Sequence, residues 1–467
     1  MFVSNKRETK QSLEMKKMKR SKLNLVAMLG LAVSVAILPS CNTNEGCTDP
    51  TASNYDADAE KDNNTCTYDD AIKSGELTAD ETWDATRIYY LQGRVVVSAG
   101  VTLTILPGAI IKGKQGTETN ASALVVAKGG TIIANGTASN PIIFTSELDD
   151  IQIGQKVGTN LTKTDNEKWG GVVILGNAPV STENGDTEGN VEGIPANLGY
   201  GVYGGSDASD NSGSLQYVSI RHGGITIGEG NELNGLTLGG VGSGTTINHI
   251  EIYATLDDGI ECFGGTVDIS NALVFFQGDD GLDIDQNYAG TINGFAVLHG
   301  DGIGTDEGLE IDGPEGTTNV NGGFHIMNGI CMSVGTSDGS AGDFKSGAQG
   351  AIDNVTFDYS SVGGKQVKFR TKFDGSCAHK TSDAYYHLVS PMGAQSLVFT
   401  NCDVTGGTKV YDGDEDLSAS PPVQTACPTE LTASQGTAAG VVASGSGSTF
   451  DYTTTFSWTA AGVRGEL

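Results

Sequence analysis

A unit that recurs between Ile247 and Gly350 constrains the fold of this chain more than any other feature. Each copy has an apolar stretch, an acid-rich turn and a second short stretch. The apolar stretches begin at Ile247, Ile269, Ile292 and Ile352, and the second stretches begin at Ile260, Leu282, Leu309 and Phe344. The first two copies are offset by about 22 residues, and such a fixed offset is typical of a solenoid whose coils stack in register. Because apolar and polar residues alternate and glycine interrupts the runs, strands are predicted here and helices are not.

The composition fits a solenoid and restricts the partners. The 467 residues include 67 glycines without the Gly-X-Y period of collagen, so many tight turns are expected. The formal net charge is −30, and without the first 40 residues 19 basic and 55 acidic residues remain, a net charge of −36. Such a surface repels nucleic acid and anionic lipid headgroups, and we expect neither as a partner. It suits divalent cations, or it simply keeps the protein soluble.

Residues 1–40 are predicted to be an export signal whose true start is Met15. Five Lys and Arg residues lie between Met15 and an apolar run, Leu23–Leu38, which is short for a membrane span. The run ends in the letters LPSC, and this ending at Cys41 resembles the lipobox of bacterial lipoproteins. The resemblance implies that Cys41 is lipidated and becomes the mature N-terminus. We therefore expect a protein of the outer membrane, lipid-anchored through Cys41 and facing the cell exterior.

Residues 41–76 form the predicted lipidated tether and a small module. The module resembles a Cys-bracketed motif that recurs in surface proteins of Bacteroidota, and an exported protein lies where disulfides persist, so a Cys47–Cys66 bridge is expected. Three acids of the module could hold Ca²⁺ through oxygen ligands, although the EF-hand glycine is missing. These acids are Asp56, Asp58 and Asp62. The alternative is a solvated acidic tether.

Residues 77–410 are predicted to form one β-helix. The phrases VTLTILPGAII, GTIIANGT and NPIIFTS resemble the opening coils of right-handed parallel β-helix proteins, particularly surface proteins of Bacteroidota. The resemblance implies an all-β, right-handed parallel β-helix and says little about activity. Residues 181–213 have little apolar periodicity, which is typical of a binding loop or a mobile flap. Tyr200 and Tyr203 in this loop could stack on sugar rings or anchor the loop to the coils.

Residues 411–467 are predicted to form a C-terminal loop and a cap, because an exposed last coil would template aggregation. Trp458 is the candidate for the capping residue. The late cysteines can pair among themselves, and the sequence leaves their pairing open. They are Cys377, Cys402 and Cys427. Cys262 takes a slot that isoleucine fills in the next two copies, so it is expected to be a small core residue.

The acid-rich turns arrange carboxylates in columns, because equivalent positions of successive coils lie about 4.8 Å apart. The columns are Asp257, Asp279 and Asp306; Asp258, Asp280 and Glu307; and Glu261, Asp283 and Glu310. Like charges this close raise one another's pKa unless a cation intervenes. Structural turns, a Ca²⁺ site and acid catalysis all stay open. The candidate Ca²⁺ ligands are Asp257, Asp258, Asp279, Asp280, Asp283, Asp306, Glu307 and Glu310.

One part of this pattern resembles the catalytic column of polygalacturonase-type glycoside hydrolases, which share the fold. Asp258 matches the family's first acid, Asp279 with Asp280 matches its acid pair, and Lys345 takes the place of its arginine. The resemblance implies that Asp280 protonates the leaving oxygen while Asp258 and Asp279 activate water. Glu307 stands where the family has histidine, and the family's second cation is missing.

The resulting hypothesis is a cell-surface lipoprotein with a Ca²⁺-stabilised β-helix that binds a glycan or a protein partner without catalysis. The runner-up is a glycoside hydrolase that uses Asp258, Asp279, Asp280 and Lys345 on an extracellular polysaccharide. A purely structural surface or adhesion protein is the third possibility. The fold by itself does not choose among these functions.

Overall fold

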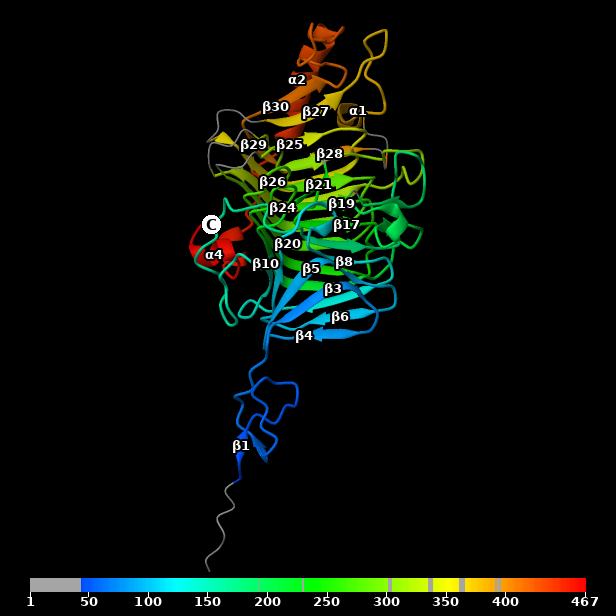
Figure 1. Cartoon of the computed structure of the whole chain (residues 1–467). Coiled ribbons are helices and arrows are strands. Elements are labelled where there is room, and N and C mark those ends of the chain that lie inside the picture. Colours follow the sequence, from blue (N-terminus) through cyan, green and yellow to red (C-terminus); the bar gives the residue numbers. More distant parts are fainter. Residues whose placement is uncertain are drawn as a thin grey trace, which may run out of the picture.

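A computed structural model describes residues 43–191, 193–228, 231–300, 305–334, 339–360, 366–390, 393 and 396–467. The expected signal segment and the lipidation site Cys41 lie outside these residues. Within the described ranges, no helix is both long and apolar enough to cross a bilayer. The chain is mostly β, and one network of 24 strands, paired in parallel, dominates it. The expected parallel β-helix is therefore confirmed, and Figure 1 shows its strands stacked along one axis.

Three parallel sheets form the walls of the β-helix. The first sheet begins with the second half of β5 (Ile88–Val97) and continues through β8 (Ala123–Val126), β11 (Val172–Leu175), β17 (Leu236–Gly239), β19 (Ile260–Phe263), β21 (Leu282–Asp285), β23 (Leu309–Ile311), β25 (Gly342–Phe344), β27 (Val367–Thr371) and β30 (Thr408–Asp412). The second contains the first half of β5 with β7 (Ile110–Gly113), β10 (Ile142–Ser146) and β29 (Asp403–Thr405). The third contains β4 (Glu81–Trp83), β6 (Thr102–Ile105), β9 (Thr131–Asn135) and β28 (Leu397–Thr400).

Six long, bent strands belong to both the second and the third sheet. They are β14 (Gly213–Arg221), β18 (Thr246–Tyr253), β20 (Asp268–Phe275), β22 (Thr291–His299), β24 (Phe324–Ser333) and β26 (Gly350–Asp358). Left-handed residues mark the bends, for example Asn271 at φ 55° and Asn354 at φ 57°, and asparagine tolerates this conformation better than most residues. The amides also form a ladder, since Asn354 Nδ2 donates to Asn328 Oδ1 at 2.6 Å and Asn401 Nδ2 to Asn354 Oδ1 at 2.8 Å.

The recurring unit stacks largely as the sequence predicts. Ile247, Ile269 and Ile292 lie in register on β18, β20 and β22, and one further coil, at β24, separates them from Ile352. Cys262 lies beside Ile284 and is fully buried, as expected. The register of the last copy was wrong by two residues. Phe344 pairs with Ile311, so Gly342 and not Phe344 takes the place of Leu309.

The β-helix begins earlier than predicted, at β3 (Ala71–Leu77), which pairs with β5. The preceding module is separate from the coils in Figure 1 and contains the short parallel pair β1 (Glu45–Gly46) and β2 (Lys61–Asp62). The expected Cys47–Cys66 disulfide is present. Asp56, Asp58 and Asp62 are not among the described acids that bring three ligand atoms within 4.8 Å of one another, so geometry gives no support to a cation there.

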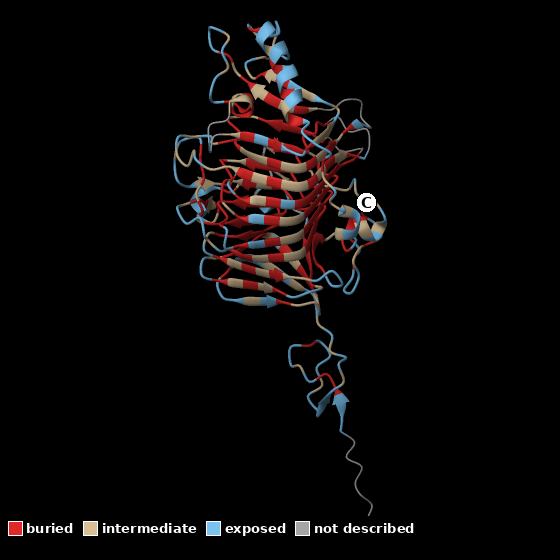
Figure 2. Cartoon of the chain, turned by 180° about the vertical axis from the view of Figure 1, so that it is seen from behind, coloured by how far each residue is buried: buried red, intermediate tan, exposed pale blue. Residues whose placement is uncertain are grey.

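Helix α2 (Pro428–Val442) packs against β30, the last strand of the first sheet, and its exposed outer face is visible in Figure 2. Cys427 at its start forms a disulfide with Cys377, which leaves Cys402 as a buried free thiol. This helix and the short α1 (Ala384–Val389) lie at the end of the stack where a loop and a cap were predicted.

Trp458 is not the cap, and this expectation was wrong. The chain returns along the side of the coils through α3 (Tyr452–Thr455) and α4 (Ala460–Arg464), where Trp458 contacts Tyr217 of β14 edge to face. Phe456 and Ala460 of this C-terminal tail, residues 450–467, pack against Phe275 and its neighbours in the second sheet. The tail therefore covers a flank of the middle coils, and α2 covers the end.

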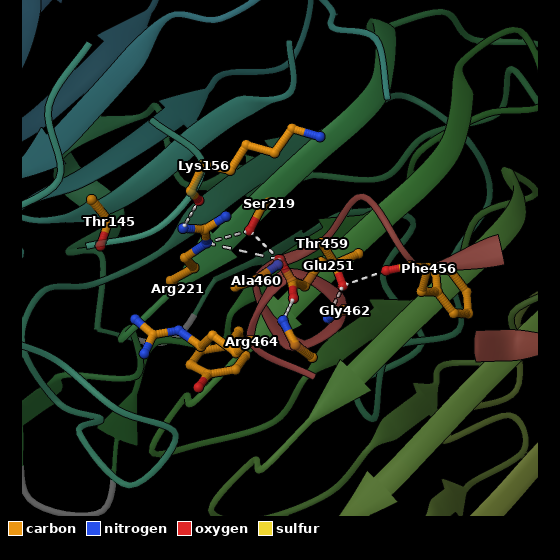
Figure 3. A network of polar contacts seen from close by, with 12 residues as sticks. Thr145, Lys156, Ser219, Arg221, Glu251, Phe456, Thr459, Ala460, Gly462 and Arg464 are labelled. Carbon is orange, nitrogen blue, oxygen red and sulfur yellow. Dashed lines mark hydrogen bonds and ion pairs between the residues drawn. The ribbon is translucent and has the colours of Figure 1, made fainter. Parts of the chain in front are cut away.

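A buried carboxylate holds this tail in place (Figure 3). Glu251 accepts hydrogen bonds from the backbone N–H of Ala460 at 2.9 Å and of Ala461 at 3.0 Å. The Ser219 hydroxyl donates to the same carboxylate at 2.5 Å, and Arg221 Nε lies 3.8 Å from it. Because Arg221 and Glu251 are both buried, removal of one charge would leave the other without its partner in the protein interior.

Three connections between the strands contain further short elements. The loop between β11 and β14 includes β12 (Gly189–Asn190), β13 (Val202–Tyr203) and η2 (Ala196–Leu198), and η1 (Glu118–Asn120) precedes β8. A second hairpin joins β15 (Thr226–Gly228) and β16 (Asn231–Glu232). The first of these loops forms one wall of the cleft described below.

Candidate acidic site

The acid-rich turns stack in the predicted order. The backbone N–H of Asp280 donates to Asp258 Oδ1 at 2.9 Å, and the N–H of Glu307 donates to Asp280 Oδ1 at 2.6 Å. In the next coil the Ser340 hydroxyl donates to Glu307 Oε1 at 2.9 Å. One oxygen of each acid thus binds the following turn, which is the structural role that Asp commonly has in turns.

A column of charged residues also runs across the outer face of the first sheet. In register from coil to coil it contains Glu261, Asp283, Glu310, Asp343, Lys368 and Lys409. Residues in register on parallel strands point to the same side of the sheet. Acids therefore occupy this column in the middle coils, and lysines occupy it in the last two.

Two lysines neutralise the C-terminal half of the acid run. Lys368 forms ion pairs with Glu307 and, at 3.3 Å, with Asp343. Lys345 forms an ion pair with Glu310 and lies 3.7 Å from Asp312. Although burial raises the pKa of Glu307, hydrogen bonds with Asp306 and the charge of Lys368 outweigh this and lower it. At this end of the run, the lysines occupy positions where a cation would otherwise be needed.

The N-terminal half of the run has no such counterion. Asp258, Glu261 and Asp283 bring ligand oxygens within 4.8 Å of one another. Among the ion pairs of the described residues, none involves these three acids. Asp283 is 8% exposed, and its Oδ1 has no hydrogen-bond partner among the described residues. Burial first, and neighbouring carboxylates second, raise the pKa of all three acids well above the usual range.

Two of these acids, Asp258 and Glu261, line a cleft of about 580 Å³, and Asp283 lies beside them on the adjacent coil without lining the cleft itself. Its lining residues are Glu183, Asn190, Val191, Tyr203, Leu233, Asn234, Thr237, Asp257, Asp258, Glu261, Phe263, Asp279, Asp285, Gln286 and Glu315. No lysine or arginine is present among them. Burial, followed by the charges of Asp312 and Glu315, raises the pKa of Asp285 to about 7. The cleft thus concentrates negative charge and would exclude an anionic ligand that brings no cation with it.

The loop 181–203 forms the wall of the cleft opposite the turns. Tyr203 is buried, stacks on Phe263 with ring centroids 5.6 Å apart, and lies within 3.3 Å of Gln286 Oε1 through its hydroxyl. Of the two roles considered for Tyr203, anchoring the loop therefore fits and stacking on a ligand does not. Tyr200 remains partly exposed and lies at a different cleft.

The other predicted site residues are distributed around this triad. Two further groups of three acids bring ligand atoms within 4.8 Å, and each shares one residue with the triad. They are Asp257, Asp258 and Asp279, and Asp280, Asp283 and Glu310. Asp306 lies beside Glu307, and burial first and the contact with Glu307 second raise the pKa of Asp306 to about 7. Lys345, the predicted catalytic cation, instead contacts Glu310 and Asp312.

Several residues of the cleft were not predicted. Asn234, which is 6% exposed, donates through Nδ2 to Glu261, and its Oδ1 has no partner among the described residues. Glu183 comes from the loop before the repeat and Glu315 from an insertion after the third copy, and nothing in their local pattern indicates a site. Lys368 lies one coil beyond the last recognised copy, and the VKFRT strand around it was the only available signal.

The donor set fits a hard divalent cation. Carboxylate oxygens with an amide oxygen are the ligands that Ca²⁺ prefers, and it takes six to eight of them at about 2.3–2.6 Å. Asp258, Glu261 and Asp283 would supply carboxylates, and the unpartnered Asn234 Oδ1 would supply the amide oxygen. The remaining positions would be left for water or a ligand. Soft-metal sites need Cys or His ligands, and neither lines the cleft.

Residues 75–384, well over half of the chain, match the family described as the pectate-lyase like beta helix domain, and the chain belongs to this family. Among solved structures it is similar to an alginate lyase from Paenibacillus sp. str. FPU-7, with 13% sequence identity and a TM-score of 0.29. That alignment covers 72% of this chain and 88% of the lyase chain. No curated protein matches the sequence.

Proposed function

We propose that the protein is a non-enzymatic, lipid-anchored surface protein whose acidic cleft holds Ca²⁺ and, through it, binds a glycan. The observation that carries the proposal is the triad Asp258, Glu261 and Asp283, which lacks a counterion among the described residues and of which Asp258 and Glu261 line the cleft. Isolated buried carboxylates are costly unless they are paired, protonated or bound to a metal. The neighbouring half of the same run is paired with Lys345 and Lys368. A cation at the triad would complete that pattern.

The cleft also leaves room for a ligand beside the cation. Ca²⁺ coordinated by four protein groups retains open positions that sugar hydroxyls or carboxylates can fill. The amides of Asn190 and Gln286 and the partly exposed ring of Phe263 border the same space. Amides and an aromatic ring are groups that orient polar ligands in small sites. A glycan therefore suits the cleft better than an apolar ligand.

The first test is direct titration of the purified protein, stripped with EDTA, with CaCl₂ in a calorimeter. We expect saturable binding to the wild type and loss of binding in Asp283→Asn, which keeps the size of the side chain and removes its charge. Glu310→Gln is the matched control, because Lys345 already neutralises Glu310. Wild-type protein that takes up no Ca²⁺, or equal binding by Asp283→Asn, would contradict the proposal.

The location is a separate part of the proposal and needs its own test. A lipidated Cys41 would be followed by the disulfide module as a spacer between the membrane and the coils, and the Cys47–Cys66 bridge fits an oxidising compartment. Metabolic labelling with a fatty acid should mark the wild type and not Cys41→Ala. Protease added to intact cells should remove the protein if it faces the exterior.

A glycoside hydrolase is the second candidate. It is favoured by Asp258 and Asp279, which line one cleft from adjacent coils. Against it, Asp280 is 3% exposed and does not line that cleft, and burial raises the pKa of Asp258, the expected base. Release of reducing sugar from a panel of polysaccharides, abolished by Asp279→Asn, would establish hydrolysis. No release from any of them would leave the binding function.

A further inference from the structure

A second cleft, of about 410 Å³, lies further along the same side of the β-helix and differs in its chemistry. It is lined by Pro314, Gly316, Thr317, Val320, Ser346, Gly347, Gln349, Thr381, Ser382 and His387. These residues offer hydroxyls, one amide and one imidazole next to small apolar surfaces, and none of them is Asp, Glu, Lys or Arg. The cleft therefore has no formal charge to match an ionic ligand.

Gln349 makes this cleft a candidate binding site. Its side chain is 3% exposed, and Nε2 donates to Asn287 Oδ1 and to the Val320 carbonyl, both at 2.9 Å. These two bonds fix the orientation of the amide. The other end, Oε1, has no hydrogen-bond partner among the described residues. A buried acceptor that lacks a donor is costly, and a ligand hydroxyl in the cleft would supply that donor.

One cation beside this cleft, Arg370, is already paired. Arg370 Nε donates to both carboxylate oxygens of Asp383, at 3.1 and 3.2 Å, and its NH2 group donates to Ser346 Oγ at 2.6 Å. The guanidinium is therefore already engaged and has no free pair of N–H donors for an anion. An anionic sugar such as a uronate would find no counterion here, whereas an uncharged sugar would need none.

The two clefts are neighbours. Glu315 lines the acidic cleft, while Pro314 and Gly316, on either side of it, line the uncharged one. Both clefts border the turns that follow strands of the first sheet, since Asp285 ends β21 and Ser346 follows β25 by two residues. Those strands are two coil steps apart, with β23 between them, which corresponds to about 10 Å along the axis. One extended ligand is long enough to occupy both clefts.

We propose that the uncharged cleft is a subsite for a neutral sugar residue of the glycan whose other part is held at the acidic cleft. This inference rests on the proposed function, because it assumes that the ligand is a glycan. Hydroxyl groups of the sugar would donate to Gln349 Oε1 and pair with the hydroxyls of Thr381 and Ser382, and Val320 would contact an apolar ring face. The assignment narrows the ligand class to glycans that contain neutral residues and excludes homopolymers of uronic acid.

The test uses Ca²⁺-loaded full-length protein and ligand-observed NMR with three probes: neutral manno-, xylo- and gluco-oligosaccharides, oligogalacturonate, and chitosan oligomers. Ser382→Tyr fills the cleft from an exposed position, so it should fold normally. Thr437→Tyr, on the exposed face of α2, is the matched control. We expect the wild type and the control to bind a neutral oligosaccharide, and Ser382→Tyr to bind it at least about tenfold more weakly with unchanged Ca²⁺ affinity.

Each outcome decides between the two proposals. Neutral-sugar binding that Ser382→Tyr leaves unchanged would overturn the subsite while the Ca²⁺-dependent function stands. Binding of oligogalacturonate or chitosan alone would also overturn it, as would the absence of binding by all three probes to Ca²⁺-loaded protein. Failure of Ca²⁺ itself to bind would instead refute the proposed function. Gln349→Leu, which removes the acceptor, should reproduce the loss in Ser382→Tyr if the variant remains folded.

Discussion

Lys345 directly follows β25 and forms an ion pair with Glu310, which belongs to the coil before it. Glu310 is also one of three acids, with Asp280 and Asp283, whose ligand oxygens lie within 4.8 Å of one another. The lysine thus supplies a positive charge at a group of oxygens that could otherwise hold an ion. Lysines of the protein thus neutralise the C-terminal half of the acid run. By our proposal, Ca²⁺ neutralises the N-terminal half.

Replacing Lys345 with methionine should therefore create a second cation site. The variant keeps the length of the side chain and removes the charge beside Glu310, so the three acids there would need another counterion. Calorimetric titration should show the Ca²⁺ stoichiometry rise from one to two. Lys409→Met, at an exposed position of the same column, is the control and should keep one site. An unchanged stoichiometry in Lys345→Met would show that Glu310 does not need a cation.

The effect of Asp283→Asn on stability should change sign with Ca²⁺. In EDTA the variant should be as stable as the wild type or more so, because one acid of a crowded buried group has been made neutral. In Ca²⁺ at 100 times the Kd, the wild type should gain about 2.7 kcal/mol and the variant should gain nothing. Melting curves with and without EDTA measure both effects. If EDTA leaves the melting temperature of the wild type unchanged, Ca²⁺ does not stabilise the protein.

Glu251→Gln should loosen the C-terminal tail. The amide has one acceptor oxygen, so it can keep only one of the two bonds from the N–H groups of Ala460 and Ala461, and it leaves the buried Arg221 without its counterion. The expected loss is about 3–5 kcal/mol in the free energy of unfolding. Limited proteolysis should release the tail early in this variant. Glu466→Gln, which weakens the partly exposed bond from the Tyr253 hydroxyl, should cost less than about 1.5 kcal/mol. Equal effects of the two substitutions would be contrary to this expectation.

His222 should make the protein less stable in acid. Burial lowers the pKa of this histidine to about 4, and its Nδ1 lies 2.5 Å from the Asp165 carbonyl, which requires an N–H at that position. Between pH 6.5 and 4 the His222 imidazole is protonated in the unfolded chain and stays neutral in the folded chain. The contribution of His222 to the free energy of unfolding is therefore fully present above pH 6.5. It falls by up to about 1.4 kcal/mol per pH unit towards pH 4. In His222→Asn, denaturant unfolding over this range should show a shallower slope, and identical slopes would disprove the assignment.

The repeat in the sequence predicted the fold and the stacking of the acid-rich turns because coil spacing and turn chemistry are local properties. Asp258, Asp280 and Glu307 stack one above another for this reason. The coil at β24 was not predicted because its FHIMNGICMS strand lacks an acid-rich turn. The register predicted for the last copy was therefore also wrong. Helix α2 was missed because its sequence is rich in Gly, Thr and Ala, although Ser434, Ala438 and Val442 repeat at the helical spacing.

The candidate site was only partly predictable. The acids of the triad were all within the predicted columns, but the sequence could not show which acids are paired. That depends on Lys345 and Lys368, whose positions follow from the register of later coils. Asn234, Glu183 and Glu315 reach the cleft from separate loops, and their arrangement is set by tertiary packing. Gln349 in the second cleft is a candidate only because its Oε1 lacks a hydrogen-bond partner among the described residues, and a sequence cannot show this.

The return of the tail to the middle of the stack changes how the rod should come apart. Repeat proteins usually have only nearest-neighbour coupling, so terminal rungs can fray one at a time. Here the hydrogen bonds between Glu251 and Ala460 join positions 209 residues apart, from β18 to a segment that lies beyond the last rung. Rungs from β18 to β30 are thereby enclosed in one closed loop of chain. We expect the coils from β18 to β30 to unfold as one cooperative unit, while the coils nearer the N-terminus can unfold separately.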